Sequence, residues 1–279
     1  MAMNLYEAAQ ERIIITAHRG VSGGNIPCNT IAAYDAAIAH GADMIEIDAN
    51  ISADGTLYSF HPGMERVHLG CDCRLPELRD EEIAALRYVN YDRVPTEWGI
   101  CTLDEIFERY KNRCFINVDK FWNHPEKISD LIRKHGMADQ IVVKTSPSER
   151  LFDIIESYAP EIAYLPVIDK DEGLHEMLKG RNINYIGAEV LFDSESSELC
   201  SDEYISRMHK DRKLVWVNSI IYNCKAQLSA RHSDDTAIAY DCESGWGWLA
   251  DKNFDIIQTD WTLALRLFLE KTGRRFKKR

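Results

Sequence analysis

Eight short runs rich in β-branched residues alternate with segments of helical period, and this alternation constrains the fold of the 279-residue chain more than any other feature. The runs span residues 12–17, 43–51, 114–119, 140–145, 161–168, 183–190, 213–220 and 254–260. Strands that alternate with helices form parallel sheets, and eight such units are the number that closes a (β/α)8 barrel. An open, doubly wound sheet remains an alternative, because the pattern alone does not establish closure.

Residues 56–100 interrupt this alternation. They contain a further strand-like run, TLYSFH at 56–61, followed by a loop-rich passage with an acidic helix within 77–88. A long excursion inside a compact domain usually marks a functional insertion. We therefore expect an α/β fold, a (β/α)8 TIM barrel with a small insertion after the second strand region. A single domain would cover residues 1–279, with the insertion at about 62–100.

The charge balance limits the partners that the chain can have. Its formal net charge of −12 argues against nucleic acid, because phosphate-binding surfaces carry an excess of Lys and Arg. The basic tail, residues 273–279, is short and terminal, so we expect it to be solvated or disordered. No apolar stretch is long enough for stable membrane insertion. The sequence leaves the oligomeric state open.

The N-terminus and the cysteines point to a reducing compartment. The first twenty residues carry acidic side chains where an export signal would be basic, and their apolar run is too short for such a signal. We therefore expect a cytoplasmic protein with reduced thiols. Cys71 and Cys73 form the only close cysteine pair, and we expect two loop thiols there rather than a zinc site.

Three acidic residues at the ends of two predicted strands suggest a metal site. Strand alternation places Glu46 and Asp48 on one face of the run 43–51, and Asp119 ends the run 114–119. Carboxylates that share a face repel each other unless a cation or a base lies between them. A salt-bridged strand end would satisfy this condition. We favour one hard divalent cation held by the carboxylate oxygens.

Two histidines lie at equivalent strand ends. His18 closes the first run and is followed directly by Arg19, while His61 closes the run 56–61 after the Asp54–Gly55 turn. An imidazole can act as general acid or base near neutral pH. Later strand ends carry further candidates. We expect Lys144 and Asn218 to contact substrate, and Trp216 and Trp261 to belong mostly to the core. Asp260 would be a helix cap or a ligand.

The order and spacing of these motifs resemble a known family. AHRG at 17–20, NT at 29–30, EID at 46–48, DG at 54–55 and the histidine at 61 resemble the glycerophosphodiester phosphodiesterases, which belong with the phosphatidylinositol phospholipase C type barrels. The similarity continues through VDK, VWVNS and DIIQTD, from about residue 12 to 265. It implies a (β/α)8 barrel with an insertion and one divalent metal, usually Mg²⁺ or Ca²⁺. It also implies cleavage of glycerophosphodiesters to glycerol 3-phosphate and an alcohol, within lipid and glycerol metabolism.

The resemblance also implies roles for single residues. His18 and His61 would be the acid–base pair, Arg19 a phosphate contact, and Lys120 or a lysine close to it a further phosphate contact. The metal ligands would be Glu46, Asp48 and Asp119. The partner would be a small glycerophosphodiester. Two alternatives stay open: a phospholipase-like lyase that forms a cyclic phosphate, and a catalytically weakened barrel that only binds a phosphorylated ligand.

The chain departs from the family pattern at three places. Cys28 stands where the family usually has Glu before Asn-Thr, and Pro62 follows the histidine where the family usually has Asp. Asp119 is followed directly by Lys120, whereas the family commonly has Glu with Lys two residues later. Strict alternation points Lys120 away from Asp119, so we expect a bulge if both face inward. With Pro62 in place, we expect either a weaker acid–base pair or another residue, such as Asp54, that orients His61.

Overall fold

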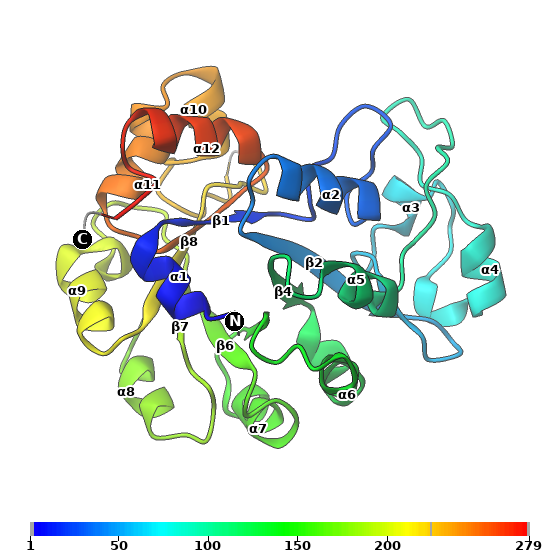
Figure 1. The fold of residues 1–279 in the computed structure, drawn as a ribbon, viewed down its shortest axis with the longest axis horizontal. Helices are drawn as coiled ribbons and strands as arrows, with labels where there is room; N and C mark the ends of the chain where they lie inside the picture. Colours follow the sequence, from blue (N-terminus) through cyan, green and yellow to red (C-terminus); the bar gives the residue numbers. More distant parts are fainter. Residues whose placement is uncertain (1–2, 224, 278–279) are drawn as a thin grey trace.

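The computed structural model describes residues 3–223 and 225–277, and within them eight parallel strands close into a barrel (Figure 1). Strand β1 pairs with β2 on one side and with β9 on the other, which joins the two ends of the sheet. The predicted (β/α)8 barrel is confirmed, and the open sheet is excluded. The parallel strands are β1 (Ile14–Ala17), β2 (Met44–Ile51), β4 (Phe115–Asp119), β5 (Ile141–Thr145), β6 (Ala163–Ile168), β7 (Gly187–Val190), β8 (Leu214–Asn218) and β9 (Ile256–Thr259).

Helices follow the strands and surround the barrel (Figure 1). Local capping explains where several of them begin: Thr102 accepts a bond from the backbone of Glu105, and the Glu105 carboxylate accepts one from the backbone of Thr102. The helices are α2 (Ile31–Ala39), α5 (Leu103–Tyr110), α6 (Pro125–His135), α7 (Glu149–Tyr158), α8 (Leu174–Lys179), α9 (Asp202–Lys210), α10 (Asp234–Ala239), α11 (Trp248–Asp251) and α12 (Thr262–Lys271).

Apolar side chains close the lower half of the barrel and leave its upper half to polar groups. These apolar side chains, which include Trp216, form the floor of the barrel, and helix α1 (Leu5–Glu11) buries Leu5 and Ala9 against them. The remaining floor residues come from the first halves of the strands: Ile14, Met44, Phe115, Val142, Leu165, Leu214 and Ile256. Trp216 is therefore a core residue, as predicted, whereas Trp261 is 50% exposed. The carboxyl ends of the strands remain available for a site.

The insertion between β2 and α5 forms a small unit of its own beside the barrel, drawn in cyan in Figure 1. It contains β3 (Leu57–Ser59), which pairs antiparallel with β2, the helices α3 (Glu65–His68) and α4 (Asp80–Ala85), and a 3-10 turn at Leu75–Glu77. A separate apolar cluster that includes Phe60, Leu75 and Tyr88 stabilises it. The Asp54–Gly55 turn thus brings the chain back beside β2, as the sequence predicted.

Two expectations about the surface are wrong. Cys71 and Cys73 form a disulfide rather than two free thiols, since their Cα atoms lie 5.3 Å apart, within the range that a disulfide bridges. The described part of the basic tail is bound rather than solvated: Arg275 is buried beside Asp43 at 2.6 Å, and Lys277 lies 2.6 Å from Asp255. The carboxylates of Asp43 and Asp255 attract these cations to the bottom of the barrel. Residues 278–279 lie outside the described residues.

Candidate active site

The site residues predicted from the sequence meet at one pocket of about 540 Å³ at the mouth of the barrel. Asp48 lies fully buried among them and contacts Arg19, His61 and Lys120. The other predicted residues line the pocket itself: His18, Arg19, Glu46, His61, Asp119, Lys120, Lys144 and Asn218. They come together because parallel strands present their carboxyl ends on one face of the barrel.

Glu46, Asp48 and Asp119 form a cluster of carboxylates on β2 and β4. Asp48 and Asp119 are register partners, and one oxygen from each of the three residues lies within 4.8 Å of the others. Burial, followed by the negative charge of Asp48, raises the pKa of Glu46 to about 7. Asp48 Oδ1 is buried and has no hydrogen-bond partner within the described residues. An orphaned buried oxygen among like charges is a donor set that suits a hard cation.

Three residues beside these carboxylates adopt the left-handed backbone conformation. Lys120, at φ 61°, turns its side chain back so that Nζ lies 2.6 Å from Asp119 and 3.9 Å from Asp48. The left-handed conformation of Lys120, rather than the bulge that we expected, therefore brings the side chains of Asp119 and Lys120 to the same side. Arg19 (φ 56°) and Asn29 (φ 57°) direct the Arg19 Nε and the Asn29 amide to 3.0 and 2.9 Å from Asp48. Such conformations cost on the order of 1 kcal/mol each and concentrate at functional sites.

His18 is held by a carboxylate from the far end of the chain. Its Nδ1 lies 2.9 Å from Asp260, which follows β9, the neighbour of β1 in the closed barrel. Burial lowers the pKa of His18, but the bond to Asp260 and the charge of Glu46 raise it more, so the pKa is raised overall. Because Nδ1 is occupied, Nε2 is the nitrogen left for chemistry. Asp260 is not the helix cap that the sequence suggested, since Trp261 is the N-cap of α12; the Asp260 carboxylate orients His18 instead.

Asp260 is itself fixed by a buried carboxylate that the sequence analysis missed. Asp234, at the start of α10, accepts a hydrogen bond from the backbone N–H of Asp260 at 2.8 Å. It also accepts from Ser219, Trp246 and Thr259, at 2.7, 2.7 and 2.8 Å. Burial raises the pKa of Asp234 to about 6. The sequence offered no signal for this residue, since its partners come from three separate segments.

Lys144 and Asn218 share one partner, Glu189 on β7. Lys144 Nζ lies 2.5 Å from one Glu189 oxygen, and the Asn218 amide donates to the other at 2.7 Å. All three side chains are buried and line the pocket. The salt bridge considered for Lys144 is therefore present. Glu189 was missed, although it stands in an apolar run, GAEV, as Glu46 does in MIEID.

Comparisons with known proteins agree with the resemblance. A family model described as a domain of unknown function matches residues 164–269. A glycerophosphodiester phosphodiesterase of Caldanaerobacter subterraneus is 28% identical over 165 residues, covering 54% of this chain and 65% of its own length. A lysophospholipase D of Rattus norvegicus is 26% identical over 163 residues, covering 54% and 49%. The chain thus spans about half to two thirds of the length of these relatives.

Solved structures extend the likeness to the whole fold. A glycerophosphoryl diester phosphodiesterase from Parabacteroides distasonis superposes with a TM-score of 0.77 at 15% identity, covering 100% of this chain and 98% of its own. A phosphodiesterase from Oleispira antarctica, in complex with the product sn-glycerol-3-phosphate, reaches 0.69 at 17% identity, covering 96% and 100%. The chain is related to the glycerophosphodiester phosphodiesterase family. The neighbours at these identities share its fold.

The departure from this family at Pro62 has a local solution in the structure. His61 Nδ1 lies 2.9 Å from the carbonyl oxygen of Pro62, which accepts a hydrogen bond from it, and His61 Nε2 lies 4.0 Å from Asp48. Burial lowers the pKa of His61. Asp54, which we expected to orient His61, instead accepts a hydrogen bond from the backbone of Asp80. A backbone carbonyl thus replaces the carboxylate in orienting the ring.

A second group of acidic residues already has its cation. His175, Glu176 and Asp211 lie close enough to hold a metal ion, but Lys179 Nζ lies 2.5 Å from Asp211 and 3.2 Å from Glu176. This group lies on α8 and just after α9, away from the pocket; Glu176 is exposed, whereas His175 is buried. We therefore assign it to the surface ion pairs.

Proposed function

We propose that the protein hydrolyses glycerophosphodiesters to glycerol 3-phosphate and an alcohol, with the help of one divalent cation. The observation that carries the proposal is the geometry of the barrel mouth. Two histidines, each with Nδ1 already occupied, line a pocket that also holds three clustered carboxylates. The similarity to a glycerophosphodiester phosphodiesterase and to a lysophospholipase D supports the same substrate class.

Glu46, Asp48 and Asp119 would hold the cation. Their oxygen donors suit Mg²⁺ or Ca²⁺, and Asp48 Oδ1 offers such an ion a ligand atom that accepts no hydrogen bond within the described residues. A bound cation supplies charge stabilisation to the phosphoryl oxygens. Arg19 and Lys120 add two positive charges beside the carboxylates, and an anionic diester would be drawn to them.

The two histidines would divide the proton transfers. Burial keeps His61 neutral near pH 7, so its Nε2 can accept a proton from the attacking water. Asp260 favours the protonated form of His18, so its Nε2 can donate a proton to the leaving alkoxide. Lys144 and Asn218, both held by Glu189, would contact the substrate from the opposite side of the pocket.

Location and domain organisation also belong to this proposal. Among the helices of the described residues, not one combines the length and the apolar character that crossing a membrane requires. We propose a cytoplasmic protein in which residues 1–279 form one domain with its insertion at about 62–100. Its partner would be a small-molecule diester.

Product analysis tests the proposed function. Purified protein with Mg²⁺ or Ca²⁺ should convert glycerophosphocholine or glycerophosphoethanolamine to glycerol 3-phosphate, followed by phosphorus NMR, and chelation should abolish the conversion. A cyclic phosphate that persists would instead indicate the lyase. Binding of the diesters without turnover, across both metals, would indicate a barrel that only binds its ligand.

A further inference from the structure

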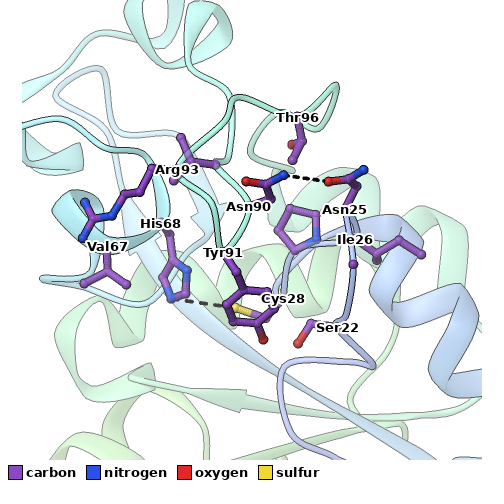
Figure 2. A pocket seen from close by; sticks show the side chains of 13 residues that line it. Ser22, Asn25, Ile26, Cys28, Val67, His68, Asn90, Tyr91, Arg93 and Thr96 are labelled. Carbon is purple, nitrogen blue, oxygen red and sulfur yellow. Dashed lines mark hydrogen bonds between the residues drawn. The ribbon is translucent and has the colours of Figure 1, made fainter.

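A second pocket of about 260 Å³ opens between the loop after β1 and the insertion (Figure 2). Its walls are largely apolar: Ile26 and Pro27 come from the loop, and Val67 and Tyr91 from the insertion. The amide of Asn90 donates to Asn25 at 2.9 Å and ties the two segments together. Ile26, Val67 and Tyr91 are 37, 51 and 87% exposed, so a ligand in this pocket would cover apolar surface that now faces water.

This second pocket adjoins the candidate active site. Cys28, which lines it, directly precedes Asn29, whose amide donates to Asp48. His68, which also lines it, lies in α3, one turn after Met64 of the catalytic pocket. Cys28 Sγ and His68 Nε2 lie 3.9 Å apart. A dashed line marks this contact in Figure 2. The positive charge of Arg19 acts on the pKa of both side chains, which places the pair near the phosphate-binding groups.

The wall formed by Cys28 and His68 is uncharged near neutral pH. Burial raises the pKa of the Cys28 thiol to about 12 and lowers the pKa of His68. Among the residues that line this pocket, Arg93 alone carries a formal charge. A cationic group such as choline would therefore meet a positive charge and no carboxylate there. An uncharged apolar group would meet walls that suit it.

We propose that this pocket binds an uncharged, apolar leaving alcohol of the diester, such as an alkyl chain, while the phosphate occupies the catalytic pocket. The inference rests on the proposed function, because it assigns the second end of the same substrate. Cys28 is central to it. A carboxylate at this position would give the wall a negative charge, whereas the thiol leaves the wall neutral.

A chain-length series tests the proposal. The substrates are glycerophosphodiesters of straight-chain alcohols from ethanol to octanol, with glycerophosphocholine as the cationic reference. If the chain enters the pocket, kcat/KM should rise by up to ~4-fold per methylene until the pocket is full, mainly through KM. Equal kcat/KM values for the ethyl and octyl diesters would overturn the proposal.

Two valines of similar exposure test where the alkyl chain binds. Val67 and Val94 both belong to the insertion and are 51 and 54% exposed, but Val67 lines the pocket and Val94 does not. Val67→Ser should flatten the dependence on chain length, while Val94→Ser should leave it as in the wild type. Equal slopes in both variants would place the chain elsewhere and contradict the proposal.

A binding measurement separates this proposal from the proposed function. Calorimetric titration of the His18→Ala protein with the ethyl and octyl diesters needs no turnover. Tighter binding of the octyl diester, lost on adding Val67→Ser, supports the pocket even if the wild type hydrolyses nothing. Equal binding of the two diesters contradicts the pocket even if the wild type is an active phosphodiesterase.

Discussion

The two sides of the barrel mouth hold buried charge in different ways. On β2 and β4, three carboxylates lie together and Asp48 Oδ1 has no hydrogen-bond partner among the described residues. On β5, β7 and β8, one carboxylate, Glu189, is fully used by Lys144 and Asn218. The first side is electrostatically incomplete and suits a cation, whereas the second is complete and can only position its neighbours. Function and stability should therefore respond differently to changes on the two sides.

The largest effect should come from His18, which follows β1, the strand that pairs with β2 of the incomplete side. His18→Ala removes a proposed general acid, and we expect kcat to fall by ~10²- to 10⁴-fold. The variant His40→Ala is a suitable control, because His40 does not line the catalytic pocket. Rates are compared by release of glycerol 3-phosphate. A His18→Ala enzyme with wild-type kcat would exclude the role assigned to this imidazole.

Neutralising a carboxylate should affect stability on one side only. Glu189→Gln leaves the Lys144 ammonium buried without its counter-ion, and we expect the free energy of unfolding to fall by about 3 kcal/mol. Glu46→Gln relieves repulsion and can still accept the hydrogen bond from the backbone of Arg19, so without added cation the stability should stay equal or rise. Urea unfolding measures both. Equal losses in the two variants would remove the distinction between the sides.

The sequence predicted those parts of the molecule that depend on local periodicity. Alternation with a period of two was enough to place Glu46 and Asp48 on one face, and the spacing of the eight runs was enough for the barrel. The contact of His18 with Asp260 joins residues 242 positions apart, and it exists because β1 and β9 are neighbours only after closure. The sequence pattern therefore does not predict this contact between distant residues.

Backbone conformation was the other part that the sequence could not supply. Lys120 faces Asp119 because its backbone has the left-handed conformation. A lysine rarely adopts this conformation, and no residue pattern predicts it. The orientation of His61 by the Pro62 carbonyl could not be predicted either, because every residue has a backbone carbonyl and the sequence does not show which one lies near the ring. Glu189 differs from these cases: the rule that identified Glu46, an acidic residue in an apolar strand, would also have identified it.

The buried Asp234, which accepts a hydrogen bond from the backbone of Asp260 behind His18, gives the fold a pH dependence of its own. A carboxyl group whose pKa is raised on folding stabilises the fold at low pH, and this contribution is lost as the pH rises from the unfolded value of 3.8 to about 6. We expect a loss of about 3 kcal/mol across that window. Asp234→Asn should flatten this part of the profile, measured as the difference in unfolding free energy between pH 4 and 7. Identical profiles for the variant and the wild type would contradict the burial of an ionisable carboxyl here.

Cation binding gives the smallest of these effects and tests the comparison most directly. A cation held only by the folded protein should raise the free energy of unfolding by about 2.7 kcal/mol at a concentration of 100 Kd. Glu46→Gln removes a ligand of the incomplete side, so the increase caused by Mg²⁺ or Ca²⁺ should shrink or vanish. Glu189→Gln starts from a lower stability but keeps all three carboxylates of the cluster, so its increase should match that of the wild type. Thermal unfolding with and without the ion measures all three proteins. If Glu46→Gln gained as much as the wild type, the carboxylates of β2 and β4 would not be the cation site, and their repulsion would need another explanation.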